Sequence, residues 1–408
     1  GAGHQRRRHA LATMFPSLTD DMMDAMAGRD LYGETVAEEP GAKEEAVPSA
    51  PEGGEGHRRP AVCAQFDAVF GYARNFKPPD VVAIAESFLR YSRRCDQLIL
   101  WCEPATVRAL RQALSPHRRP DKGRVLLLNE NEWTRVVYAS QRFEGLPRGM
   151  TGTERIAVFL LWMELFHMKY RYLVHIDVRD SIFYDNLFAQ LEEVNVTGLF
   201  SVAEVHLFKG QAHNNMWVTS YTGSPAATDF FSKMTLHGRP LPVLCSGIYG
   251  GTSTAVYDYL AAFADAVLHA GSQVHSIIGI DQGIHVYLQL AGLPLAGFPH
   301  PIAMLDDASG PMHHWYRGEV RRDKLGRHLN CLGRRYAVVH QLDRYEGLWH
   351  QAARDAYRLR TGPWTLPPAA SPPPLSPGRG IHSLEDTTDE TSSTSTDAVV
   401  SAWYARRP

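Results

Sequence analysis

Short apolar runs of strand length alternate with segments of helical periodicity between about residues 60 and 360. This alternation is typical of βα units, which build a mainly parallel sheet covered by helices. No repeat of 20 to 50 residues is visible, which argues against solenoids and propellers. The sequence therefore predicts an α/β fold, with strands at 62–70, 97–101, 124–128, 171–176, 242–252 and 336–344, and helices at 79–92, 105–114, 151–168, 254–268 and from 280. Thr151 is expected to cap its helix, with Glu154 three residues on.

The two ends of the chain differ in composition from its middle. The first part is rich in Gly, Pro, Glu and Ala, and the last part is rich in Pro and then in Ser and Thr. Such segments bury too little apolar area to offset the entropy of ordering. We expect a disordered leader at 1–59, a folded domain at 60–360 and a disordered tail at 361–408.

The charge balance excludes one class of partner. Lysine and arginine number 42 and aspartate and glutamate 44, for a formal charge of −2. No basic stripe alternates with aromatic residues, so we do not expect nucleic acid to bind. The apolar runs are far shorter than the roughly 20 residues that cross a bilayer, so the chain as given is expected to be soluble. A membrane anchor outside the given chain stays open.

The cysteines stand at positions 63, 95, 102, 245 and 331. Their number is odd, they are scattered, and no C-x-x-C pair occurs. We therefore expect structural thiols and neither a zinc site nor a disulfide framework.

The strongest local pattern is an apolar strand that ends in two acids, Asp177 and Asp180. Ligands of open α/β sheets bind beyond the carboxyl ends of the strands, and paired carboxylates there can hold a hard cation such as Mg²⁺ or Mn²⁺. The alternative is an acidic turn in which Asp180 caps a helix that begins near Ser181.

Three later segments add polar groups at strand or helix ends. The run 242–252 is a strand leading into a turn of small residues, which let backbone N–H groups approach a phosphate or a sugar; it could also be only a flexible turn. Asp281 and His285 stand four apart on one helix face, where the alternative is an acid that favours the helix N-terminus. His340 follows a strand and is either structural or a metal ligand.

Together these motifs resemble the GT-A-fold glycosyltransferases that use nucleotide-diphospho-sugars, and in particular a subgroup with Asp-Val-Arg-Asp in place of Asp-x-Asp. The resemblance runs from about Asp67 to Leu348 and is carried by the order of four motifs. They are Leu173-Val174-x-x-Asp177-Val178-Arg179-Asp180, Cys245-Ser246-Gly247 with Gly250-Gly251-Thr252, Asp281-Gln282-Gly283-Ile284-His285, and Val338-Val339-His340-Gln341. The resemblance implies a Rossmann-like mixed sheet, mostly parallel and flanked by helices.

The resemblance also implies roles for individual residues. Asp180, Asp177 and His340 would surround Mn²⁺ or Mg²⁺, and Asp281 would be the acid near the reacting sugar. The donor would be bound by Arg155, Arg179, Ser246, Gly247 and Gln282, the two arginines because guanidinium matches phosphate. The acceptor would meet His285 and Trp217, whose indole could stack on a sugar or could simply pack in the core.

The function implied is metal-dependent transfer of a sugar from a nucleotide-diphospho-sugar to a hydroxyl of a glycan or glycoprotein. Two alternatives are a catalytically degenerate sugar-nucleotide or glycan binder and a metal-dependent phosphohydrolase. The resemblance places the protein in the Golgi lumen or secretory pathway, with the sequon at 195–197 as slight support. The sequence does not identify the donor, the acceptor or the stereochemistry, because the contacts that select them lie in loops.

Overall fold

The structure, a computed structural model, describes residues 63–114, 122–236, 239–270, 274–314, 321–324 and 326–341. All of them belong to one of the two units into which the chain divides, 1–357. The leader predicted at 1–59 and the tail predicted at 361–408 lie outside the described residues.

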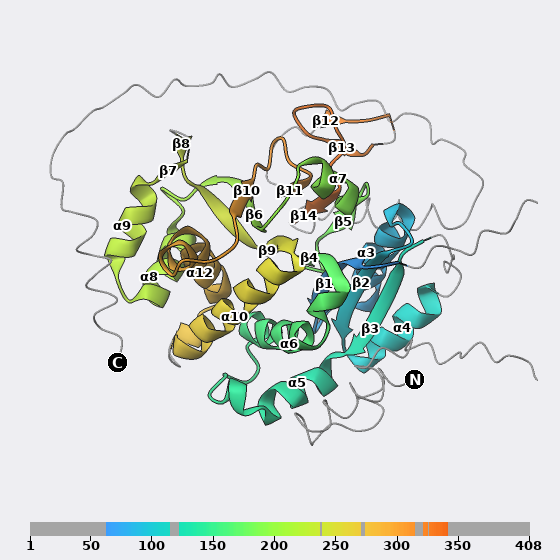
Figure 1. Ribbon diagram of the computed structural model, residues 1–408, viewed down its shortest axis with the longest axis horizontal. Helices are drawn as coiled ribbons and strands as arrows, with labels where there is room; N and C mark the ends of the chain where they lie inside the picture. Colours follow the sequence, from blue (N-terminus) through green and yellow to red (C-terminus); the bar gives the residue numbers. More distant parts are fainter. Residues whose placement is uncertain are drawn as a thin grey trace, which may run out of the picture. The chain divides into compact units, whose positions relative to one another are not determined.

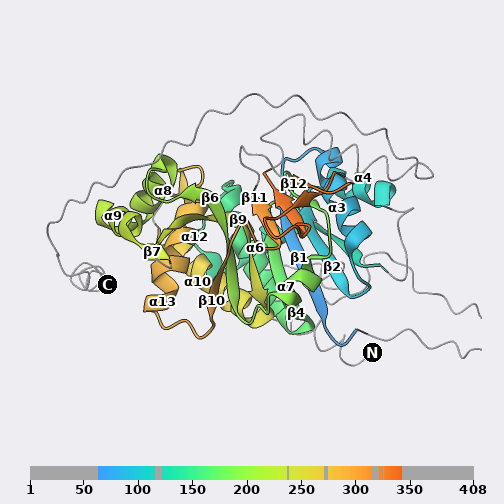
Figure 2. The ribbon, with the colours of Figure 1, turned by 90° about the horizontal axis from the view of Figure 1, so that it is seen from above.

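Seven strands of the described chain form one sheet in the order β10-β6-β9-β4-β1-β2-β3 (Figures 1 and 2). All neighbouring strands pair in parallel except β9, which runs antiparallel to both β4 and β6. The mixed, mostly parallel sheet flanked by helices is therefore confirmed. The strands are β1 (Phe66–Ala73), β2 (Asp96–Cys102), β3 (Arg124–Asn129), β4 (Tyr170–Ile176), β6 (Leu199–Leu207), β9 (Pro242–Thr252) and β10 (Ile302–Leu305).

Helices cover both faces of this sheet because alternate side chains of each strand point to opposite faces. Ala68 and Phe70 join an apolar cluster with α5 (Glu130–Ala139), α6 (Thr151–Phe166), α10 (Ser253–His269) and α12 (Ile280–Tyr287). Val69 joins the cluster of α3 (Pro78–Tyr91), α4 (Pro104–Leu114) and α7 (Leu187–Glu193). No helix among the described residues combines the length and apolar character needed to cross a membrane.

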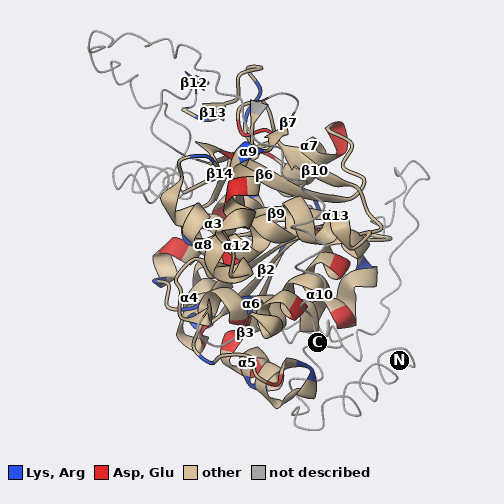
Figure 3. Cartoon of the chain, turned by 90° about the vertical axis from the view of Figure 1, so that its left-hand side faces the viewer, with Lys and Arg blue, Asp and Glu red and all other residues tan. Residues whose placement is uncertain are grey.

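Charged residues of both signs are interspersed over the face of the molecule that Figure 3 shows. The remaining elements lie outside the main sheet. A three-stranded sheet has the order β11-β14-β5, in which β14 is parallel to β11 and antiparallel to β5. The smaller elements are β5 (Ile182–Phe183), α8 (Ala212–Thr222), α9 (Pro225–Lys233), β7 (Thr235–Leu236), β8 (Arg239–Pro240), α13 (Leu293–Leu295), β11 (Met312–His314), β12 (Arg321–Arg322), β13 (His328–Leu329) and β14 (Val338–His340).

Three local predictions are wrong. No helix begins near Ser181; instead, buried Ile182 and Phe183 pair with β14. The small residues after Cys245 continue strand β9 and form no turn, because they pair with β4 on one side and β6 on the other. Their small size allows this close pairing, since a Cβ at Gly250 would lie 2.5 Å from the Leu173 carbonyl. Thr151 is the first residue of α6 and not its cap.

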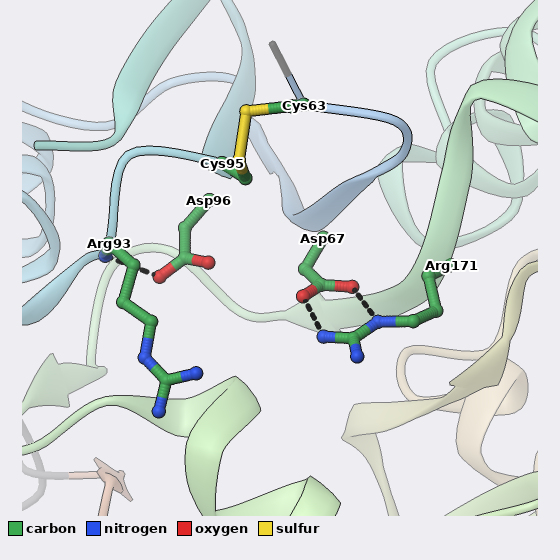
Figure 4. The surroundings of a disulfide bond; sticks show 6 residues. All are labelled: Cys63, Asp67, Arg93, Cys95, Asp96 and Arg171. Carbon is green, nitrogen blue, oxygen red and sulfur yellow. Dashed lines mark hydrogen bonds and ion pairs between the residues drawn. A yellow bond between two sulfur atoms is a disulfide. The ribbon is translucent and has the colours of Figure 1, made fainter. Parts of the chain in front are cut away.

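The cysteine prediction is also wrong, because Cys63 and Cys95 form a disulfide (Figure 4). Cys63 precedes β1 and Cys95 precedes β2, and these strands are parallel neighbours in which Asp67 faces Asp96. Residues just before paired strands therefore meet, although 32 positions separate them in sequence. Beside the disulfide, Asp67 holds Arg171 of β4 through two hydrogen bonds.

Candidate functional site

The candidate site lies where the order in which successive strands are added to the sheet changes direction. Strands β2 and β3 follow one another on one side of β1, and the chain then returns to place β4 on the other side of β1. In open α/β sheets, ligands bind beyond the carboxyl ends of the strands at such a switch point. Asp177 follows the last residue of β4, so it stands at this position.

The acidic turn from Asp177 to Asp180 is fixed by buried apolar residues on both sides. Val178 is buried and packs so closely on β1 that a Cβ at Gly71 would lie 2.3 Å from its methyl group. The turn is then followed by Ile182 and Phe183 of β5. The backbone N–H of Asp177 also donates to the Gly247 carbonyl at 2.8 Å, which joins the turn to β9.

Arg155 of α6 joins two carboxylates that are distant in sequence. Its Nη1 donates to Asp177 Oδ1 at 2.5 Å and its Nη2 donates to Asp281 Oδ2 at 2.7 Å. Burial alone would raise the pKa of Asp177, but the charge of Arg155 and the nearby His175 and His340 hold it well below its usual value. Arg155 is therefore paired with two carboxylates, and its pairing with phosphate stays a prediction.

His340 meets the acidic turn through its Nδ1 atom. Nδ1 lies 3.0 Å from Ser181 Oγ and 3.0 Å from Asp180 Oδ1. The strand register explains this contact, because Val339 pairs with Ile182 and the next residues, His340 and Ser181, are then opposite each other. Burial alone would lower the pKa of His340, but the carboxylate of Asp180 raises it well above its usual value.

A second cluster lies around His340. Its members are Cys245 of β9 and His314 at the end of β11, and the ligand atoms of the three side chains all lie within 4.8 Å of one another. His314 and His340 are register partners on parallel strands, which places their rings side by side. Burial alone would raise the pKa of the Cys245 thiol, but His314 and His340 lower it. Likewise, burial alone would lower the pKa of His314, which Cys245 and Asp307 raise to about 10.

The sequence did not predict this cluster. Cys245 was expected to be a structural thiol, and His314 was not singled out at all. The available signal was a histidine at the end of each of two short strands, Met312–His314 and Val338–His340. Their pairing could not be read from the sequence.

The predicted donor residues of β9 and α12 lie together at this edge of the sheet. Ser246 Oγ donates to Gln282 Oε1 at 3.4 Å, and Gln282 Nε2 donates to Asn214 at 2.8 Å. A Cβ at Gly247 would lie 2.6 Å from His340 Nε2 and 2.7 Å from Asp177 Oδ2. The absence of a side chain at Gly247 therefore lets the acidic turn and His340 approach β9.

The remaining predicted residues differ in their placement. Trp217 of α8 is partly exposed and packs against Gly279 and Gly283, which flank Asp281 in the chain. Arg179 is exposed, with its guanidinium 5.8 Å from the ring centre of Phe76.

His285 does not reach the site, so the prediction that it contacts an acceptor is wrong. Its ring is fully buried and is hydrogen-bonded to Ser201 Oγ at 3.2 Å and to the Tyr259 hydroxyl at 2.5 Å. Burial lowers the pKa of His285 to about 3. On the same face of α12, Asp281 points to the site, whereas His285, one turn later, belongs to the core.

A further polar network at the end of β1 was not predicted from the sequence. The Tyr72 hydroxyl donates to Glu130 at 2.5 Å, and Glu130 also accepts from Thr134 at 2.9 Å. Arg74 contacts both Glu130 and Glu154. The network depends on α5, which the sequence did not predict as a helix.

A separate hollow of about 470 Å³ lies beside α7 and β13. Its lining includes Asn186, Glu193, Asp323 and Arg335. None of the residues predicted to bind a donor, an acceptor or a metal lines it, so it has no part in the candidate site.

Comparisons with known proteins were made at the level of sequence and structure. No model of a protein family matches the chain, and no curated protein matches its sequence. Among solved structures, it is similar to mouse xyloside xylosyltransferase 1 in its apo form, with 13% identity and a TM-score of 0.41, over 68% of this chain and 97% of the mouse chain. A likeness at this level carries no conclusion, so the function proposed below is based on the motifs and on the geometry of the site.

Proposed function

We propose that this protein is a GT-A-fold glycosyltransferase that moves a sugar from a nucleotide-diphospho-sugar to a hydroxyl of a glycan or glycoprotein. The observation that supports it most is the double contact of Arg155 with Asp177 and Asp281. This contact joins the first and third of the four motifs, and Gly247 and His340 bring the other two to the same edge of the sheet.

The carboxylates of the acidic turn suit a divalent cation on the donor diphosphate. Asp180 Oδ1 is buried and lies 3.0 Å from His340 Nδ1. Mn²⁺ and Mg²⁺ prefer such hard oxygen ligands and take their other ligands from water and phosphate. We place the ion at the carboxylates of Asp177 and Asp180, where it would neutralise charge on the leaving diphosphate. His340 is proposed to orient the Asp180 carboxylate through its Nδ1 atom. Arg179, exposed on the same turn, is proposed to meet the phosphates.

Asp281 is the proposed catalytic acid residue. Its side chain is 14% exposed, and Arg155 holds one of its oxygens. The other oxygen remains to accept a hydrogen bond from a sugar hydroxyl, either as the base that deprotonates the acceptor or as a group that orients the donor. Ser246, Gly247 and Gln282 would line the sugar pocket, and Trp217 would offer an aromatic face to the acceptor.

We also propose that the protein works in the secretory pathway, with the Golgi lumen as the expected compartment. The Cys63–Cys95 disulfide supports this, because such bonds form and persist in oxidising compartments. Asn195 of the sequon is exposed in the turn after α7. An acceptor glycan or glycoprotein would be available there.

The donor can be identified by a panel of nucleotide-sugars tested against the full chain with and without Mn²⁺, with thermal shift as the measurement. We expect one donor to raise the melting temperature only with the metal. The Asp180→Asn variant should lose that shift, whereas Asp265→Asn, at an exposed acid of α10, should keep it. No shift with any donor would contradict the proposal. Release of phosphate from simple esters would favour the phosphohydrolase instead.

A further inference from the structure

We propose that Cys245, His314 and His340 form a buried binding site for a thiophilic divalent cation, with Zn²⁺ as the expected ion. This site is separate from the one formed by the carboxylates of Asp177 and Asp180. The inference does not depend on the proposed glycosyltransferase function, because it rests on these three side chains and their neighbours.

The distances between the three ligand atoms suit a single ion. Zn²⁺ lies about 2.3 Å from a cysteine sulfur and about 2.0 Å from a histidine nitrogen, so in tetrahedral geometry two ligands of one ion are about 3.3–3.5 Å apart. All three ligand atoms lie within 4.8 Å of one another without an ion. Side-chain movements of up to about 1.5 Å would therefore close the site. All three residues are almost fully buried, at 1% exposure.

The hydrogen bonds of His340 leave its other nitrogen for a metal. The Ser181 hydroxyl donates its only hydrogen to the Asp177 carbonyl at 2.7 Å. Ser181 Oγ must then accept from His340, so Nδ1 carries a hydrogen and Nε2 is the nitrogen that would bind the metal, with release of its proton. A metal-bound histidine is commonly oriented in this way by a hydrogen bond from its second nitrogen.

His314 has the surroundings of a ligand but lacks a partner. Neither of its ring nitrogens has a hydrogen-bond partner among the described residues, although both are buried. Nδ1 lies 3.6 Å from Asp307 Oδ1, and Asp307 is itself fixed by the His314 backbone N–H at 2.5 Å and by His313 at 2.9 Å. Buried polar groups almost always have partners, and a cation between His314 and Cys245 would supply the missing one.

The donor atoms determine which cation binds. A thiolate with two imidazoles favours Zn²⁺, whereas Mn²⁺ and Mg²⁺ favour carboxylates, water and phosphate. Two ions could thus be selected by neighbouring ligand sets, with His340 Nε2 assigned to the zinc set and Asp180 left to the donor cation. The zinc would also bridge β9 of the main sheet and β11 and β14 of the small sheet, which carry the three ligands. Its binding energy would stabilise the contact between the two sheets.

The test is metal analysis of the full chain, purified without a metal-affinity step and with zinc in the growth medium. We expect elemental mass spectrometry to find about one zinc per chain. After the zinc is exchanged for Co²⁺, we expect the absorption of a thiolate-to-cobalt charge transfer. Cys245→Ser and His314→Gln should each remove most of the zinc, and Cys245→Ser should also remove the cobalt band.

The matched control is Cys102→Ser, because Cys102 is also a free and buried thiol but lies on β2, outside the cluster. That variant should keep both the zinc and the cobalt band. Circular dichroism would show that the variants fold. Zinc content unchanged in folded Cys245→Ser and His314→Gln, or a native chain that binds neither Zn²⁺ nor Co²⁺, would overturn the inference. Zinc content is measured independently of donor binding and turnover. A failure of the zinc proposal can therefore be told apart from a failure of the proposed glycosyltransferase function.

Discussion

Arg155 Nη2 lies 2.7 Å from Oδ2 of Asp281, although the two residues are 126 positions apart in the chain. Through its other terminal nitrogen the same guanidinium holds Asp177, the residue that follows β4. The side chains of Arg155 and Asp281 are only 12% and 14% exposed, whereas that of Asp177 is 36% exposed. The distance between the proposed metal-binding turn and the proposed catalytic acid is therefore set by one side chain.

Replacing Arg155 should damage both stability and donor binding. In Arg155→Gln, two carboxylates lose their shared cation, and breaking a buried pair from one side costs roughly 3–5 kcal/mol. Urea unfolding measures this loss. Arg155→Lys should recover part of the stability but not the double contact, because an ammonium lacks the planar fork. Arg135→Gln, at an exposed position of α5, should cost less than about 0.5 kcal/mol. Equal stability of Arg155→Gln and Arg135→Gln would contradict the role given to Arg155.

The Cys63–Cys95 bond should contribute measurably to stability. It closes a loop of 32 residues, for which the chain-entropy estimate is about 3–4 kcal/mol. Cys95→Ala should lower the free energy of unfolding by about that amount, and reduction of the native protein should do the same. The control is Cys331→Ala, which removes an exposed free thiol. If the Cys95 variant unfolded at the same urea concentration as the native chain, the disulfide would be absent in solution.

Much of the fold could be predicted from the sequence, because local patterns determine it. The helices at Pro78–Tyr91 and Thr151–Phe166 and the strand at Tyr170–Ile176 were predicted to within a few residues, since each has a clear apolar period or run. The pairing of β5 with β14 was not predicted. It joins residues more than 150 positions apart, and a two-residue strand carries no periodicity.

In the candidate site, too, residues marked by local sequence patterns were predicted and residues brought in by long-range contacts were not. Asp177, Asp180 and His340 were singled out because each is a polar residue at a strand end. His285 was assigned wrongly, because spacing on a helix gives the face of a residue but not whether that face meets a cavity or the core. His314 was missed because only the register of β11 and β14 brings it to His340, and Cys245 was missed because it comes from β9 of the other sheet.

The buried His285 predicts a pH dependence of stability. Its pKa is lowered to about 3 by burial, whereas an unfolded histidine has a pKa near 6.5. Between these values the unfolded state binds more protons, so stability is lost as the pH falls from about 6.5 towards 3, by up to about 1.4 kcal/mol per pH unit for this residue. Urea unfolding at several pH values measures the slope. His285→Gln should reduce the slope in this range, whereas His269→Gln, at an exposed position, should not.

A methyl group at Gly247 tests how tightly the site is built. In Gly247→Ala the new Cβ would meet His340 Nε2 and Asp177 Oδ2 at under 3 Å, so one of these groups must move. We expect calorimetry to show weaker binding of the donor with Mn²⁺, by at least about tenfold, which corresponds to roughly 1.4 kcal/mol. Unchanged affinity would show that neither side chain contributes to donor binding in this position.

The central claim is that the site transfers a sugar. The most direct measurement is release of nucleoside diphosphate from the donor that shifts the melting temperature, with Mn²⁺ and with simple glycosides as acceptors. We predict that an acceptor speeds release by the native chain and that Asp281→Asn, while still binding the donor, slows it by at least about a hundredfold. Donor binding with no release in the presence of any acceptor, or equal release by Asp281→Asn, would contradict the account.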